Sequence, residues 1–132
     1  MTPPALPPDE SERPDNRAGG PVNAGTIREL REAAGDEGYA QIRTEFLSAT
    51  EVQLGAMTRA AEGGDSEALR RAAHSLRGAS GSLGASGLEA LCRELETSLA
   101  AGASASSGER SAAVARLAAE FAAVRRALLE AE

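Results

Sequence analysis

The residue best suited to chemistry in this sequence is His74, the only histidine among 132 residues. An exposed neutral imidazole near pH 7 is a competent nucleophile, and it can also take up or release a proton. Around it runs the segment 72–87, AAHSLRGASGSLGASG, in which glycine recurs at every third position from Gly78 to Gly87. A histidine taken alone is more often a residue without a task, so its interpretation depends on how this glycine-rich segment folds.

Two local structures are open for the glycine-rich segment. Each glycine in a helix interior costs about 1 kcal/mol relative to alanine, which favours a loop after Arg77. The helical wheel instead favours a helix that continues to about Gly84, because one side then becomes a consistent core stripe of Leu69, Ala73, Leu76, Ser80 and Leu83. The opposite side then carries Arg70, His74, Arg77, Gly78 and Gly81. A strip without side chains beside an exposed imidazole would let a second protein bring a recessed catalytic group against the ring, and we therefore predict the helix.

The elements that must position this segment are marked by capping residues. Ser or Thr followed three residues later by Glu predicts a capping box, in which the hydroxyl and the carboxylate satisfy backbone N–H groups at a helix start. The pattern occurs three times, at Thr26 with Glu29, Ser86 with Glu89 and Ser106 with Glu109. Two further starts are expected after Gly35, capped by Asp36, and after the pair Gly63 and Gly64, capped by Asp65 or Ser66.

The apolar spacing between these boundaries predicts four long amphipathic helices, each with a stripe at intervals of three and four residues. Besides the stripe around His74, they carry Tyr39, Ile42, Phe46, Leu47, Leu54, Met57 and Ala61; Leu88, Leu91, Cys92, Leu95 and Leu99; and Val114, Leu117, Phe121, Val124 and Leu128. With short loops and a short helix from Thr26 to about Ala34, the pattern predicts an all-α fold. This fold is an antiparallel up-and-down four-helix bundle preceded by a short N-terminal helix.

Composition and charge narrow the class of protein. The length suits one domain, and 42% hydrophobic residues with only 2% aromatic residues favour helices rich in Ala and Leu. All six prolines lie in residues 1–22, which we predict to be a disordered tail before a bundle of residues 23–132. The formal net charge of −6 disfavours nucleic acid and membrane surfaces as partners. No segment is apolar enough to span a bilayer, and we expect a cytoplasmic protein.

Cys92 is the only cysteine, so no intrachain disulfide is possible. Because it falls on an apolar stripe beside Leu91 and Leu95, we expect a small core residue and not a redox or metal thiol. A metal-dependent hydrolase is disfavoured, since the chain has one His, one Cys and no His-Glu-x-x-His pattern.

The string from His74 to Gly84, HSLRGASGSLG, closely resembles the motif of histidine-containing phosphotransfer domains. In that motif His, an apolar residue, Lys, Gly, small residues, an apolar residue and Gly recur in this order. The later segment 88–96, LEALCRELE, also looks like the following helix of the family, and the resemblance covers residues 23–132. One position departs from the pattern: Arg77 stands where Lys is common, and the chain contains no Lys.

The resemblance implies a phosphocarrier of a two-component phosphorelay, without ATP-dependent kinase activity of its own. His74 would accept a phosphoryl group and exchange it with an aspartate of a response-regulator receiver domain, and a hybrid histidine kinase is a further expected partner. Arg77 would hold the phosphoryl oxygens through parallel donors, and the receiver would dock against Gly78, Gly81, Arg70 and Arg71. The receiver would bring Mg²⁺ in its own acidic pocket, so we expect neither metal nor cofactor on this chain.

Other interpretations stay open. Arg70 and Arg71 would also suit an ordinary solvated helix surface. A non-catalytic helical interaction module would explain the stripes and caps, but it leaves the glycines around His74 without a purpose. The chain would also suit the phosphate-accepting domain of a larger histidine kinase. A monomer is the default expectation, although the sequence does not decide the oligomeric state.

Overall fold

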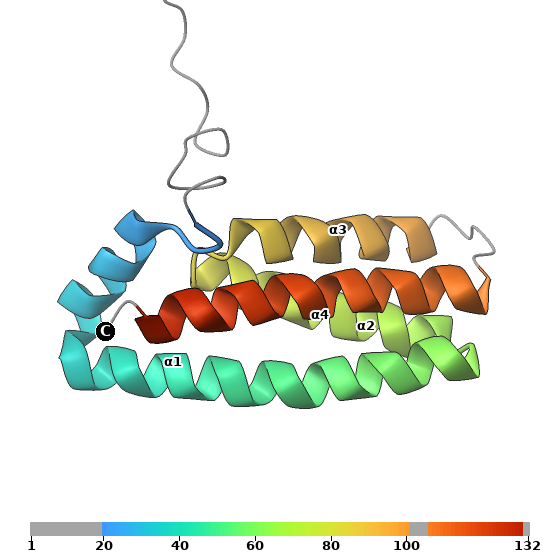
Figure 1. Ribbon diagram of the computed structural model, residues 1–132, viewed down its shortest axis with the longest axis horizontal. Helices are drawn as coiled ribbons and strands as arrows, with labels where there is room; N and C mark the ends of the chain where they lie inside the picture. Colours follow the sequence, from blue (N-terminus) through green and yellow to red (C-terminus); the bar gives the residue numbers. More distant parts are fainter. Residues whose placement is uncertain (1–19, 101–105, 131–132) are drawn as a thin grey trace, which may run out of the picture.

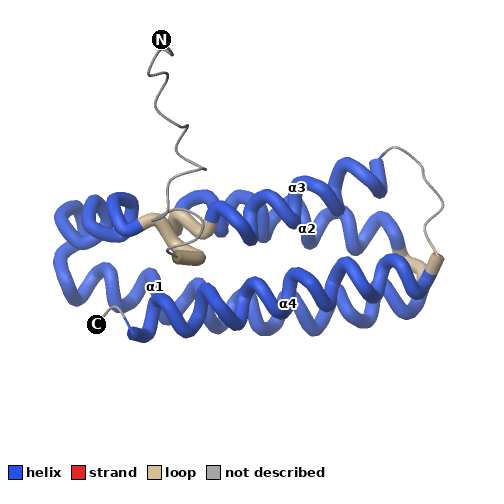
Figure 2. Tube along the Cα trace, turned by 45° about the horizontal axis from the view of Figure 1, so that its top comes forward, coloured by secondary structure: helices blue, strands red, loops and turns tan. Residues whose placement is uncertain are grey.

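The computed structural model describes residues 20–100 and 106–130, and all regular elements in these ranges are helices. The helices are α1 (Ala24–Gly63), α2 (Ser66–Ser82), α3 (Ser86–Ala100) and α4 (Ser107–Glu130). They run alternately in opposite directions, with α2 packed mainly against α3, and with α1 packed against both α4 and α2 (Figure 1 and Figure 2). The predicted all-α antiparallel bundle is confirmed. None of these described helices is both long and apolar enough to cross a lipid bilayer.

Helix α1 consists of two helical segments that meet at Gly35. The φ of 79° and ψ of 168° at Gly35 lie outside the helical region, and glycine adopts this conformation without a steric penalty. The segment 24–34 therefore turns away from the long segment 36–63 and lies across one end of the bundle (Figure 1). It is the predicted short N-terminal helix.

The start of α1 differs from the predicted capping box at Thr26. Asn23 is the N-cap, because its Oδ1 accepts a hydrogen bond from the backbone N–H of Thr26 at 2.9 Å. Thr26 therefore lies inside the first turn, and the predicted role of its hydroxyl is wrong. Asparagine ranks with serine and aspartate among the strongest N-caps, which is why it sets the boundary here.

The other predicted starts are right in position but not always in chemistry. Ser106 and Glu109 form a complete capping box, with N–O distances of 2.8 Å and 3.0 Å between each backbone N–H and the other side chain. Asp65 caps α2 by accepting from the N–H of Ala68 at 3.1 Å. At α3 the predicted box is not formed: Glu89 pairs with Arg93 at 3.3 Å instead of folding back to Ser86.

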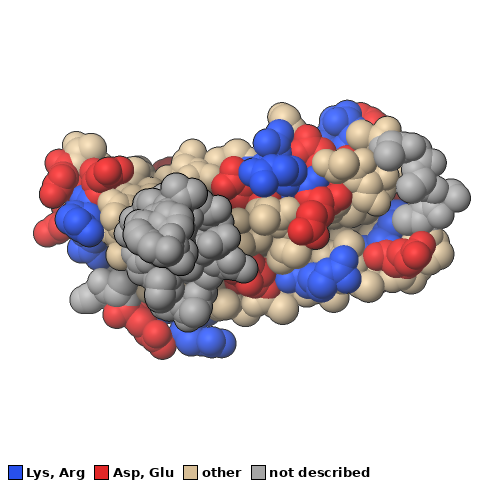
Figure 3. All heavy atoms as spheres, turned by 90° about the horizontal axis from the view of Figure 1, so that it is seen from above, with Lys and Arg blue, Asp and Glu red and all other residues tan. Residues whose placement is uncertain are grey.

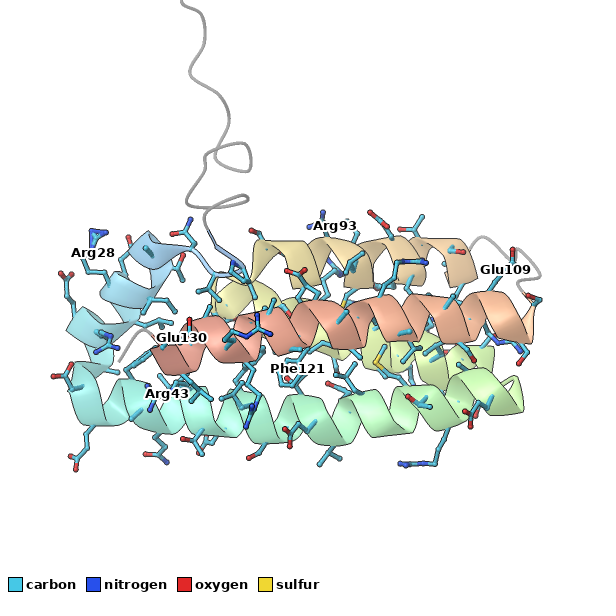
Figure 4. All side chains as sticks on the ribbon, viewed as in Figure 1. Arg28, Arg43, Arg93, Glu109, Phe121 and Glu130 are labelled. Carbon is cyan, nitrogen blue, oxygen red and sulfur yellow. The ribbon has the colours of Figure 1, made fainter. Side chains whose placement is uncertain are left out.

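The predicted apolar stripes meet in one core. Every member of the stripes on α2 and α4 is buried: Leu69, Ala73, Leu76, Ser80, Leu83, Val114, Leu117, Phe121, Val124 and Leu128. The stripes on α1 and α3 are buried along their centres and half-buried at their edges, at Ile42, Leu47, Leu54, Leu91 and Leu99. Phe121 points from α4 toward α1 (Figure 4), where its ring meets Phe46 edge to face with centroids 6.2 Å apart.

Cys92 is fully buried on α3, as expected for a core residue. Burial raises the pKa of its thiol to about 12. The thiol therefore stays protonated near neutral pH and is not a nucleophile.

The folded part begins slightly before the predicted boundary at Asn23. Of the predicted tail of residues 1–22, only residues 20–22 are described, and Val22 packs against the core. The predicted disorder of residues 1–19 lies outside the described residues.

The turn between α2 and α3 holds the start of α1. The backbone N–H of Asn23 donates to the carbonyl of Gly84 at 2.9 Å. Gly84 has a φ of 76°, and a Cβ there would lie 2.8 Å from the Cβ of Thr26. Only glycine fits a position that combines a left-handed conformation with so close an approach. This turn ends α2 and fixes where α3 starts.

Candidate functional site

Helix α2 runs unbroken from Ser66 to Ser82 and includes Gly78 and Gly81, so the predicted continuous helix is confirmed. Its end falls just short of Gly84. Two glycines cost about 2 kcal/mol of helix propensity, and burial of the apolar stripe on the other side of α2 offsets this. His74 lies in the middle of α2 with 61% of its side chain exposed.

A carboxylate from α3 binds the imidazole. Nδ1 of His74 lies 2.6 Å from Oε1 of Glu96, whose side chain is 16% exposed. Hydrogen bonds from His74 and Arg77 hold the pKa of Glu96 below its ordinary value, so the carboxylate is ionised and can only accept. In the neutral ring, Nδ1 therefore carries the hydrogen and Nε2 has the lone pair. One ring nitrogen is anchored and the other is left for chemistry.

Arg77 binds the second oxygen of the same carboxylate. Its Nε donates to Oε2 of Glu96 at 2.9 Å, while its Nη2 lies 3.2 Å from Nδ1 of His74. Because the hydrogen on Nδ1 points to Glu96, the contact between Nη2 and Nδ1 joins two donors and is not a hydrogen bond. Glu96 thus serves both partners, one oxygen each. We call His74, Arg77 and Glu96 the His–Arg–Glu cluster.

The predicted bare strip beside His74 is only partly bare. Gly78 is exposed, and a Cβ there would have no other heavy atom within 4 Å beyond its own helix backbone. Gly81 is also exposed, but a Cβ there would come 3.2 Å from Oε2 of Glu89 on α3. The approach to the helix backbone is therefore open at Gly78 and bordered by a carboxylate at Gly81.

The other two predicted docking residues lie one turn before His74 and share a carboxylate. Arg70 binds Glu67 through Nη2 at 2.6 Å and Nε at 3.2 Å, and Arg71 approaches the same carboxylate at 3.6 Å. The hydrogen bond with Arg70 holds the pKa of Glu67 below its ordinary value and raises that of Arg70.

Charges around the cluster therefore occur in pairs of opposite sign. Glu67 with Arg70, Glu96 with Arg77, and Glu89 with Arg93 supply three such pairs. Figure 4 shows Arg93 projecting from α3 on the side away from α4. Acidic and basic side chains alternate over this side of the molecule (Figure 3), so it is not a basic surface.

The described residues contain no group of three or more His, Cys, Asp or Glu side chains that could hold a metal ion. In the His–Arg–Glu cluster the guanidinium takes one carboxylate oxygen, and its positive charge opposes a second cation. The arrangement suits an incoming anion better than a metal.

Glu96 is the site residue that the sequence interpretation missed, because it lies 22 residues after His74 on another helix. A usable signal existed in the hairpin. In an antiparallel pair of helices that turns at Gly84, the residues opposite His74 lie about ten positions beyond the turn, near Glu94 and Glu96. Both flank the core residue Leu95, and the structure places Glu96 against His74 on α2 and Glu94 in the groove against α4.

Comparison with known proteins agrees with this geometry. The family model of the Hpt domain matches residues 41–127. The crystal structure of histidine-containing phosphotransfer protein B from Pseudomonas aeruginosa PAO1 is similar to this chain, with 31% sequence identity and a TM-score of 0.75. The similarity covers 83% of this chain and 91% of that one. A search of curated protein sequences gave no match. The chain belongs to the Hpt domain family, whose members are phosphotransfer carriers of phosphorelays without kinase activity of their own.

Proposed function

We propose that Nε2 of His74 is the atom that carries the phosphoryl group. The observation that supports this is the hydrogen bond from Nδ1 to Glu96 at 2.6 Å on a side chain that is otherwise exposed. It holds the ring in one orientation and one tautomer, with the lone pair of Nε2 available. Orienting a nucleophile in this way is a main source of rate in phosphoryl transfer.

The proposed donor and acceptor is an aspartate of a response-regulator receiver domain. In the forward step the lone pair of Nε2 forms the N–P bond, the P–O bond to the aspartate breaks, and its electron pair returns to the aspartate carboxylate. The ring keeps its hydrogen on Nδ1 and gains a positive charge, which faces Glu96. Reverse transfer follows the same step backward. Arg77 is the proposed donor to the phosphoryl oxygens, since it lies one turn from His74 on the same side of α2.

Docking of the receiver is proposed to use the exposed backbone at Gly78, with Gly81, Arg70 and Arg71 around it. The openness at Gly78 supports this, because a Cβ placed there would meet no side chain of another helix within 4 Å among the described residues. We expect Mg²⁺ to belong to the receiver, which would leave this chain without a cofactor. A hybrid histidine kinase as a second partner, a monomeric state and a cytoplasmic location are parts of the same proposal.

The decisive experiment is to mix the chain with a phosphorylated receiver domain and follow labelled phosphate. We expect acid-labile, base-stable label on the wild type, which maps to His74 because the chain has no other histidine. His74→Gln should abolish the label while far-UV circular dichroism stays unchanged. Ser75→Ala, a neighbouring exposed change, should accept phosphate normally. Label on His74→Gln would refute the assignment, and a wild type that binds receivers without ever taking label would favour a plain interaction module.

A further inference from the structure

The His–Arg–Glu cluster has one feature that the transfer step does not explain. The guanidinium of Arg77 is already bound to the carboxylate of Glu96 before any phosphoryl group arrives. Nε of Arg77 is bound to Oε2 of Glu96 at 2.9 Å, and both side chains are partly buried, with exposed fractions of 32% and 16%. The terminal Nη2 meanwhile lies against a ring nitrogen that offers it no acceptor. Arg77 is therefore held by the carboxylate on one edge and makes no hydrogen bond with the imidazole on the other.

A phosphoryl group on Nε2 would change the competition for this guanidinium. It brings a charge of about −1.5 to −2 and three strong acceptor oxygens. Glu96 brings a single negative charge and also has to serve Nδ1. Two anions on opposite edges of one ring would then compete for one cation, and the phosphoryl group carries more charge and accepts in a bidentate manner.

The surroundings leave Arg77 free to change partner. It is at position i+3 from His74 on the same helix, so both sites lie within reach of its side chain. Gly78 next to it presents no side chain, and the space above Gly78 is open. Only one hydrogen bond to Glu96 has to break, because Nη2 lies against the ring and only Nε binds that carboxylate.

We propose that Glu96 lowers the stability of phosphorylated His74 by competing with the phosphoryl group for Arg77. This rests on the proposed function of His74. In the unphosphorylated protein Glu96 binds both His74 and Arg77. After transfer, Arg77 leaves Oε2 for the phosphoryl oxygens, while Nδ1–H stays on Oε1. The ion pair given up is a cost that the phosphorylated state alone bears, so the phosphoryl group passes onward to an aspartate more readily than if Arg77 were unpaired.

A double-mutant cycle isolates this competition from the other effects of Glu96. The four chains are the wild type, Arg77→Gln, Glu96→Gln and the double variant, each brought to equilibrium with the same phosphorylated receiver domain. The measured quantity is the ratio of phosphate on the chain to phosphate on the receiver. Glu96→Gln alone also alters the imidazole, but that change is common to both Arg77 backgrounds and cancels in the cycle.

Arg77→Gln should lower the ratio about two- to fivefold more in the Glu96→Gln background than in the wild type, the range expected for one partly exposed ion pair. The matched control is Glu94→Gln, which removes the same charge from α3 but on the side that lines the groove against α4. In that background the effect of Arg77→Gln should equal its effect in the wild type. Equal effects of Arg77→Gln in the wild type and in Glu96→Gln would overturn the proposal.

A second measurement needs no receiver. Phosphoramidate can phosphorylate histidine directly, and the Nε–H resonance of Arg77 reports its partner by NMR. We expect Glu96→Gln to move this resonance in the unphosphorylated chain and to leave it nearly unmoved in the phosphorylated chain. A resonance that phosphorylation does not shift, and that still depends on Glu96, would overturn the partner exchange. If receivers never phosphorylate the chain, the proposed function fails while this measurement still decides the exchange.

Discussion

Helices α2 and α4 both bury an apolar stripe in the core, but their outer surfaces differ. Both bury a full stripe of five residues, the last of which on the α2 side is the C-cap Leu83. After Gly108, α4 contains no glycine and its outer surface is built largely from Ala, Arg and Glu, which are strong helix formers. Helix α2 places Gly78 and Gly81 on the outer surface beside His74. The buried stripe is enough to keep α2 helical, so its outer surface is free to give up helix propensity for access to the imidazole.

The largest expected effect concerns the packing of α4 in the core. Phe121→Ala removes the ring that meets Phe46, and we expect the free energy of unfolding to fall by about 3–5 kcal/mol. Urea denaturation followed by circular dichroism measures this. The control Arg126→Ala, on the exposed side of α4, should change the free energy by no more than about 0.5 kcal/mol. A loss below 1 kcal/mol for Phe121→Ala would mean that the packing of α4 against α1 contributes little to the stability of the bundle.

Changes at Gly78 test whether the open outer surface of α2 serves docking of the receiver. Gly78→Ala should raise the free energy of unfolding by about 1 kcal/mol, because the added methyl group meets no neighbour. Gly78→Leu should also keep the helix, but it should slow phosphoryl transfer from a receiver by about tenfold or more by filling the approach surface. Time courses of phosphoryl transfer, quenched at intervals, measure the effect on docking, and urea denaturation of the same samples measures the effect on stability.

Gly81→Ala is the matched control for this site. Its methyl group would meet Glu89 at 3.2 Å, so the gain in stability should be smaller than at Gly78. An unchanged transfer rate for Gly78→Leu would show that the open backbone plays no part in docking.

The core side of α2 also differs from that of α4, through Ser80. Its hydroxyl is fully buried, and within the described part of the chain it has no hydrogen-bond partner. Ser80→Ala should therefore stabilise the protein by about 1 kcal/mol more than Ser75→Ala, which makes the same change on the exposed side. Comparing thermal unfolding of the two variants removes the shared gain in helix propensity. A larger gain from Ser75→Ala would mean that the hydroxyl of Ser80 is satisfied in solution.

The smallest expected effect concerns acid. The pKa of Glu96 is lowered in the folded state, first by the hydrogen bond from His74 and then by Arg77. Its contribution to stability is therefore present above its ordinary pKa of 4.5 and is lost as the pH falls through the lower folded value. Glu96→Gln should lose less stability than the wild type between pH 6 and the acid transition. Parallel stability profiles of the two proteins would contradict this.

Most of the fold follows from local physics that the sequence displays. The stripes on α2 and α4 are buried residue for residue, and Gly35, Gly64 and Ser106 mark real boundaries, because period and capping depend on neighbours within one turn. The predictions fail where two local options compete, as when Asn23 caps α1 in place of Thr26. They also fail where a partner comes from another element. Glu96 joins His74 only through the packing of α3 on α2, and Glu89 lies beside Gly81 for the same reason.

The short turn at Gly84 also sets the position of α3 relative to α2. The turn is held by the hydrogen bond from Asn23 to the carbonyl of Gly84 and by the close approach of Gly84 to Thr26, so one residue inserted between Leu83 and Ala85 would shift the start of α3 relative to α2. Helix content would barely change, yet the carboxylate of Glu96 would swing away from the imidazole. The length of this turn is therefore as much a determinant of the nucleophile's orientation as the identity of any side chain, and insertions there should be silent in far-UV spectra but visible in the nitrogen resonances of His74.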